Sequence, residues 1–147
     1  MAAQLNHTIV HVRDQHESAA FLADVLGTDP PTTYGPFAVV ELANGVSLDF
    51  LDDAGSISPQ HYAFLVTEGE VDEILARIRG RDLTHWADPG RQRSGEINSN
   101  DGGRGVYWDE PSGHSSRSSP VRTAAGTADE GQALKVPGRG CTVAGTE

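Results

Sequence analysis

The sequence predicts an α+β protein that repeats one plan twice: a strand, a helix, then further strands. Residues 5–12 and 60–66 open alike, because each places a histidine at the head of an apolar, β-branched or aromatic run. A helix-start pattern follows each of these runs at once, and turn residues then separate shorter apolar runs. This succession of periodicities indicates two similar units in one domain.

The first unit covers about residues 5–53. Residues 5–12 form its first strand, a capping pattern at Asp14 starts a helix, and Gly27 is placed to end it. Proline and glycine then turn the chain, and an Asn-Gly pair predicts a hairpin. The remaining strands are expected at residues 37–42 and 46–51, with a short extra strand near residue 33.

The second unit covers about residues 60–114 and repeats the order of the first. Residues 61–66 form a strand, and a capping box at Thr67 starts a helix with an apolar stripe. Further strands are expected at residues 83–86 and 104–109, with a polar loop at 88–103 between them. The plan then requires a last strand, but the residues after His114 are Ser-Ser-Arg-Ser-Ser-Pro. Such a segment cannot bury an apolar face, so we expect this strand to be missing or disrupted.

Composition divides the chain into a domain at residues 1–114 and a tail at residues 115–147. The tail is rich in Ser, Gly, Ala, Thr and Arg, and its few apolar residues cannot offset the entropy cost of ordering it, so we expect disorder there. The whole chain carries a formal net charge of −10. So acidic a protein is not attracted to nucleic acid or to an anionic membrane, and we expect neither as a partner.

Cysteine content and hydropathy indicate a compartment. The sole cysteine, Cys141, lies in the tail, which excludes a disulfide framework and suits a reducing environment. We find neither a basic segment followed by an apolar stretch nor an apolar run of membrane-spanning length. We therefore expect a cytoplasmic protein.

Four motifs carry a family resemblance. They are Leu-Asn-His-Thr-Ile from residue 5, Phe-Leu-Ala-Asp-Val-Leu-Gly from residue 21, His-Tyr-Ala-Phe from residue 61 and Gly-Val-Tyr-Trp-Asp-Glu-Pro-Ser-Gly-His from residue 105. In this order they resemble the vicinal oxygen chelate superfamily, which includes glyoxalases, bleomycin- and fosfomycin-resistance proteins and extradiol dioxygenases. The resemblance covers residues 5–114. It implies two βαβββ modules that form a cupped mixed sheet around a divalent metal (Zn, Mn, Fe or Ni).

The resemblance also implies site residues. One histidine from the first strand of each module, here His7 and His61, would bind the metal, together with a glutamate three residues after the Gly-His motif. That third position holds Arg117, which cannot ligate a cation. Aligning the two modules places Asp49 at the equivalent position of the first, so Asp49 is a candidate third ligand. Tyr107, in the most specific motif, is a candidate catalytic residue that would hold substrate.

Structural roles remain open for each of these residues. His7, His61 and Tyr107 can instead be packing residues of their strands, and Asp49 can be a solvated aspartate at a sheet edge. His85 beside Trp86 is expected to pack.

Three functions follow from these expectations. The first is a divalent-metal-dependent enzyme that acts on a small oxygen-rich substrate by isomerisation, epoxide addition or dioxygenation. The second is a metal-free protein that binds a small molecule, as bleomycin-resistance proteins do. The third is a chain inactivated by loss of the carboxylate ligand. A homodimer is expected in each case, because close relatives commonly pair modules across two chains and open sheet edges need covering.

A shifted reading frame would explain the polar segment after His114. Suppose one C was lost directly after a CAC codon for this histidine. In the restored frame, the last two bases of each codon are the first two bases of a codon in the present frame. A serine codon of the TCN type therefore becomes a codon for Phe, Leu, Ile or Val. With suitable third bases the segment restores as Leu-Leu-Glu-Ile-Leu-Thr-Arg-Pro-Tyr-Gly, with glutamate in place of Arg117. A genuinely divergent tail is the alternative.

Overall fold

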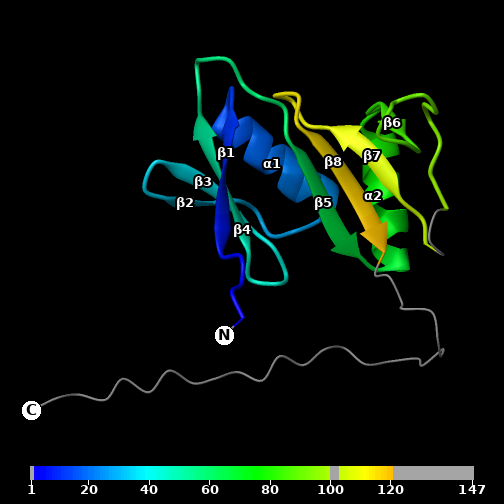
Figure 1. Cartoon of the computed structure of the whole chain (residues 1–147), viewed down its shortest axis with the longest axis horizontal. Coiled ribbons are helices and arrows are strands. Elements are labelled where there is room, and N and C mark those ends of the chain that lie inside the picture. Colours follow the sequence, from blue (N-terminus) through cyan, green and yellow to red (C-terminus); the bar gives the residue numbers. More distant parts are fainter. Residues whose placement is uncertain (1, 100–102, 121–147) are drawn as a thin grey trace, which may run out of the picture.

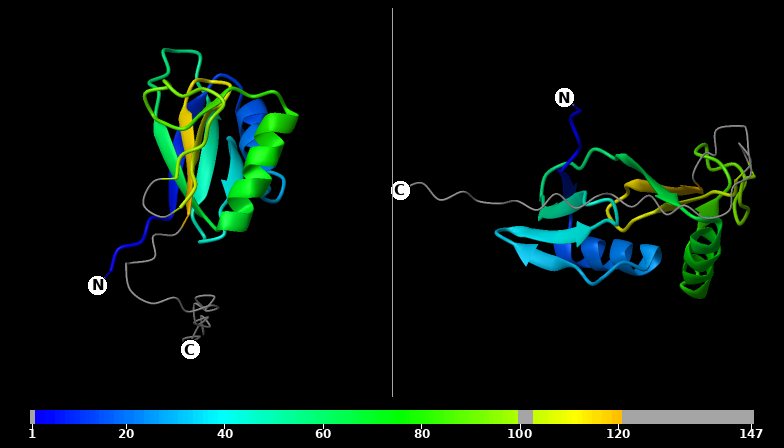
Figure 2. Two further views of the ribbon diagram at one scale, coloured as in Figure 1. Left: turned by 90° about the vertical axis from the view of Figure 1, so that its right-hand side faces the viewer. Right: turned by 90° about the horizontal axis from the view of Figure 1, so that it is seen from below.

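The computed structural model describes residues 2–99 and 103–120, which form two four-stranded sheets with both helices on the same side of them (Figures 1 and 2). The first sheet has the order β1-β4-β3-β2, with β1 at His7–Val12, β2 at Thr32–Tyr34, β3 at Phe37–Glu41 and β4 at Ser47–Asp52. The second has the order β5-β8-β7-β6, with β5 at His61–Val66, β6 at His85–Trp86, β7 at Val106–Asp109 and β8 at Ser115–Pro120.

The pairing directions are the same in the two sheets. β1 runs parallel to β4, and β5 runs parallel to β8, whereas every other neighbouring pair is antiparallel. This identity of order and direction confirms the duplicated βαβββ plan and the α+β fold.

The helices begin where the sequence predicts. The Asp14 carboxylate accepts hydrogen bonds from the backbone N–H groups of His16 and Glu17, each at 2.9 Å, and so caps α1 (Gln15–Leu26). Gly27 ends this helix with a φ of 74°, a left-handed conformation that glycine adopts without strain. Thr67 starts α2 (Glu68–Gly80) with a complete capping box.

Alternation along the strands separates a core face from an open face. In the first sheet, Val10, Val40 and Phe50 are buried toward the helices, whereas His7 and His11 on β1 are exposed on the other face. The second sheet buries Phe64, Val106 and Trp108 in the same way, and one apolar cluster includes residues of both modules. The open faces are thus the part of the molecule available for a ligand.

The expectation of a missing last strand is corrected by β8. Residues 115–120 form a strand between β5 and β7, because backbone pairing on both sides satisfies its N–H and C=O groups regardless of its side chains. The expected disordered tail otherwise falls on residues 121–147, which lie outside the described residues.

His114 joins the two modules. Its ring is 1% exposed, Nε2 donates to the backbone carbonyl of His11 at 2.8 Å, and Nδ1 accepts from the backbone N–H of Gln60 at 3.0 Å. Ser112 adds a second connection by accepting from the backbone N–H of Arg13 at 2.9 Å. In the described part of the chain, neither helix is long and apolar enough to cross a membrane.

Candidate functional site

The open face of the first module is hollowed. The hollow has a volume of about 510 Å³ and lies over β1, β2, β3 and β4. Its lining combines aromatic and apolar surface with polar groups: Asn6, His7, Ile9, Thr32, Thr33, Tyr34, Phe37, Val39, Glu41, Ser47 and Asp49. The lining is more polar than that of most small-molecule sites, but a concave surface with convergent polar groups beside aromatic ones is where a small molecule would bind.

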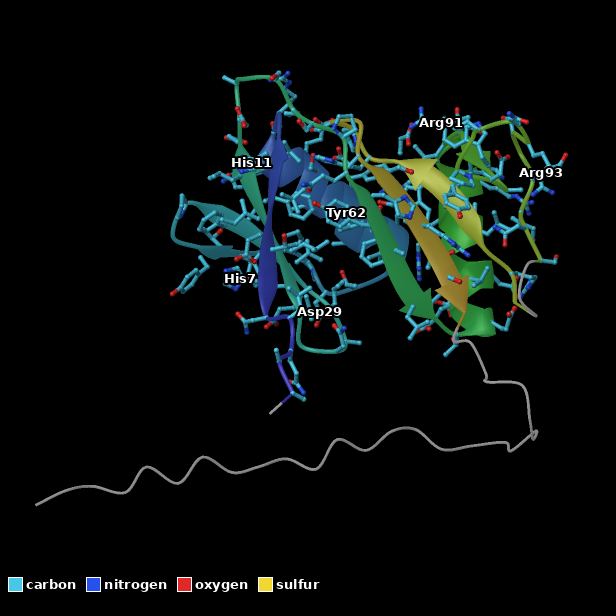
Figure 3. All side chains as sticks on the ribbon, in the orientation of Figure 1. His7, His11, Asp29, Tyr62, Arg91 and Arg93 are labelled. Carbon is cyan, nitrogen blue, oxygen red and sulfur yellow. The ribbon has the colours of Figure 1, made fainter. Side chains whose placement is uncertain are left out.

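Two of the predicted site residues, His7 and Asp49, line this hollow. His7 lies at the start of β1, opposite Ser47 of β4 (Figure 3). Its Nδ1 is 2.7 Å from the Asn6 Oδ1, an acceptor, so Nδ1 carries the proton and the Nε2 lone pair is free to accept a proton or bind a cation. Asp49 is 8% exposed and accepts a hydrogen bond from the Ser47 hydroxyl at 2.7 Å.

The other two predicted residues, His61 and Tyr107, lie on the second module. Their ring centroids are 6.0 Å apart with an interplanar angle of 37°. The Arg117 guanidinium carbon lies 5.2 Å from the centroid of the Tyr107 ring, a cation–π contact. Tyr107 therefore packs between a histidine and an arginine and is itself only 6% exposed.

The structure brings the candidate residues together in pairs. The first pair, His7 and Asp49, lies on the first module. The second pair, His61 and Tyr107, lies on the second module, where Arg117 contacts Tyr107. Among residues 2–99 and 103–120, no three His, Cys, Asp or Glu side chains form a group that could hold a metal ion. The ligand set His7, His61 and Asp49 stays a prediction.

Sequence reasoning missed a buried polar cluster at the junction of the modules. Glu110 is 7% exposed, and its Oε1 accepts from the backbone N–H of His114 at 3.1 Å. Burial, and secondarily the charge of Glu110, raise the pKa of the Tyr62 phenol, which donates a hydrogen bond to Gln60. The Asp-Glu-Pro-Ser-Gly-His motif contains both Glu110 and His114, and its specificity could have indicated this role in joining modules.

The arginines near the polar loop make ion pairs. Arg91 lies 2.8 Å from the Asp109 carboxylate and 5.1 Å from the Trp86 ring centroid. Arg104 contacts Glu68 at 2.9 Å and Asp72 at 2.6 Å, which lowers the pKa of each carboxyl. The positive charges of both arginines are thus paired with carboxylates of the protein itself, with no need for an anionic ligand.

Comparison with known proteins agrees with the duplicated fold. Residues 4–115 match the model of the Glyoxalase/Bleomycin resistance protein/Dioxygenase superfamily. The solved structure of Oxidase ChaP-H1 is 59% identical, with a TM-score of 0.80, and the match covers 82% of this chain and 97% of that one. Oxidase ChaP-H2 is 56% identical, with a TM-score of 0.80 and coverage of 82% and 95%.

A more distant structure shares the fold. Lactoylglutathione lyase from Agrobacterium tumefaciens is 19% identical, with a TM-score of 0.63 and coverage of 85% of this chain and 98% of that one. No curated protein matches the chain. The family model, which spans most of the chain, shows that this protein belongs to the Glyoxalase/Bleomycin resistance protein/Dioxygenase superfamily, the vicinal oxygen chelate superfamily.

Proposed function

We propose that this protein is an oxidase-type member of the superfamily that acts on a small oxygen-rich molecule, and that Arg117 weakens this activity. The observation that supports the proposal most directly is the 59% identity to Oxidase ChaP-H1 over 97% of that chain. The hollow of the first module supports it independently, because its lining suits a hydroxylated ring.

Each part of the lining would have a role in binding. Tyr34 and Phe37 offer aromatic surface to a planar substrate, and Asp49 and Glu41 offer carboxylates that accept hydrogen bonds from hydroxyl groups. His7, with a free lone pair on Nε2, would take a proton from a bound hydroxyl and so act as a general base.

The divalent metal implied by the family is the less supported part of the proposal. His7, Glu41 and Asp49 all line the hollow, but in the described part of the chain they do not form a group of three that could hold a metal ion, whereas catalytic metal sites commonly have three protein ligands. Arg117 occupies the position that the resemblance assigns to the third ligand and adds a positive charge there. The residues of one chain therefore do not fit a metal, and we assign no step of the reaction to one.

The proposal includes a homodimer. β1 and β5 are edge strands of their sheets, and they expose Ile9 by 41% and Leu65 by 69%. A second copy would cover these residues, so Ile9→Lys with Leu65→Lys is expected to shift a dimer to monomer in light scattering. The cytoplasmic location stays a prediction.

Oxygen uptake tests the proposed activity. Native protein, Arg117→Glu and the matched Arg117→Gln are incubated with catechol or hydroquinone, with and without Fe(II), Mn(II), Zn(II) or Ni(II), on an oxygen electrode. We expect slow uptake by the native chain and an increase of about tenfold or more only in Arg117→Glu, and loss of uptake in His7→Ala. Uptake that is absent from every variant would overturn the oxidase proposal.

A metal-free binding protein is the second candidate, and the contact of Arg117 with Tyr107 favours it. A guanidinium held over a ring beside His61 suits an anionic group better than a cation. Calorimetric titration separates the candidates: tight binding of a phenolic ligand without stoichiometric metal and without oxygen uptake would support the binder.

A further inference from the structure

The β8 strand occupies a central position of its sheet but lacks the side chains that this position requires. It pairs with β5 on one side and β7 on the other. Two of its residues, Ser116 and Ser118, are 2% and 0% exposed, and both are hydroxyl-bearing. A central strand packed against a helix normally buries apolar residues at such positions.

The first module shows which residues suit this position. β4 is the counterpart of β8, with Leu48 opposite Thr8 and Phe50 opposite Val10 across its parallel neighbour. In the second module, Ser116 stands opposite Tyr62, and Ser118 stands opposite Phe64. Apolar residues at two positions of the first sheet thus correspond to serines in the second.

The serines leave defects in the core. The Ser118 hydroxyl and Arg117 Nε are buried without a hydrogen-bond partner. Ser116 borders a small core hollow, and the other residues that line it are Val10, Leu22, Leu48, Phe50, Tyr62, Glu110 and His114. An unsatisfied hydroxyl at a buried position of β8, and a small hollow where Ser116 meets the apolar core, are the features expected where larger apolar side chains are lacking.

We propose that the codons after His114 are read one base out of the frame in which this strand was selected. Restoring one C after a CAC codon makes each new codon end in the first two bases of a written residue. TCN serine codons then give apolar residues. The restored codon at position 118 begins with the third base of the present Arg117 codon. If the Arg117 codon is AGA or AGG, this base is A or G, and the restored residue is Ile or Val.

The restored strand matches the position that the structure provides. It reads Leu-Leu-Glu-Ile-Leu-Thr, against Ser-Leu-Asp-Phe-Leu-Asp in β4. Both buried positions become apolar, and the position equivalent to Asp49 becomes a carboxylate. The same shift of reading frame then explains why this chain has Arg117 where a carboxylate ligand is expected. The inference does not depend on the oxidase proposal, since its tests measure neither oxygen uptake nor turnover.

The coding DNA is the first test. We expect TCN codons at the four serines of β8, AGA or AGG at Arg117, and an open frame with the restored residues when one C is added after codon 114. AGT or AGC serine codons, a CGN codon at Arg117 or an immediate stop in the restored frame would overturn the proposal.

The protein is the second test. Ser116→Leu with Arg117→Glu and Ser118→Ile, made in the full chain, is compared with the same variant carrying Arg117→Gln. We expect both triple variants to raise the melting temperature by roughly 10 °C or more. Ser56→Leu with Ser58→Leu, which adds leucines at exposed positions, should not raise it.

Metal titration separates the two triple variants. With Zn(II) or Mn(II) alone as the probe, we expect the glutamate variant to bind about one ion per chain and its glutamine match to bind at least about tenfold more weakly. A melting temperature that does not rise in either triple variant, or equal metal binding by both, would contradict a strand selected in the restored frame.

Discussion

Asp49 and Arg117 occupy equivalent positions in the two sheets and carry opposite charges. Asp49 of β4 stands opposite Ile9 of the parallel strand β1, and Arg117 of β8 stands opposite Ala63 of the parallel strand β5. Both side chains lie on the open faces of their sheets. One module therefore presents an anion, and the other presents a cation, at corresponding points.

The charge of Asp49 provides a test of the hollow. Asp49→Asn keeps the size of the side chain but removes the charge that strengthens a hydrogen bond to a bound hydroxyl. We expect the dissociation constant for catechol, measured by calorimetry, to rise about tenfold or more. Ser47→Ala, which leaves the carboxylate in place, should have a smaller effect; equal binding by Asp49→Asn and native protein would place the ligand elsewhere.

The capping box of α2 makes a prediction about stability. Thr67→Ala removes the hydroxyl that accepts from the backbone N–H of Glu70 and should lower the free energy of unfolding by about 1 kcal/mol in urea denaturation. Thr84→Ala changes an exposed threonine of the same module and serves as the control. If the two variants unfold at the same urea concentration, the box does not stabilise this helix.

Arg104 makes a prediction about pH. Hydrogen bonds from Arg104 lower the pKa of Glu68 and of Asp72 below their usual values. A carboxyl with a lowered folded-state pKa stabilises the fold above its unfolded pKa, near 4, and the contribution is lost as the pH falls through the folded pKa. Arg104→Gln should therefore melt below native protein at pH 7, and the difference should vanish in acid once both carboxyls are protonated.

Arg79, an exposed arginine on the same helix as Glu68 and Asp72, supplies the control for this pH series. The melting temperature of Arg79→Gln should fall between neutral and acid pH by the same amount as that of native protein. A constant gap between Arg104→Gln and native protein across the whole range would show that the arginine acts through packing instead.

Local patterns predicted most of the fold, because they depend on neighbouring residues. The caps at Asp14 and Thr67 and the turn at Gly27 are confirmed, since each is a short-range property of backbone and side chain. The equivalence of Asp49 with Arg117 also follows from the sequence repeat and agrees with the strand registers.

Long-range relationships were harder to predict. The strand β8 forms although its residues are polar, because two neighbouring strands supply hydrogen bonds that no local pattern contains. His114 contacts the carbonyl of His11 across 103 positions of sequence, and spacing alone does not reveal such a contact. His7 and His61 lie on β1 and β5 of different modules, and only the family resemblance, not a local pattern, predicted that they bind one metal.

The position of β8 can be tested through Gly105. A Cβ atom at Gly105 would lie 2.9 Å from the carbonyl oxygen of Ser118 and 3.1 Å from the Asn98 side chain. Because the first neighbour is backbone, Gly105→Ala must displace β8 and should cost about 1–3 kcal/mol in urea denaturation. Gly69→Ala, in α2 with open space around it, should instead stabilise the protein by about 0.5–1 kcal/mol. Opposite signs for two identical substitutions are expected if β8 lies against Gly105, and a neutral Gly105→Ala would contradict this pairing.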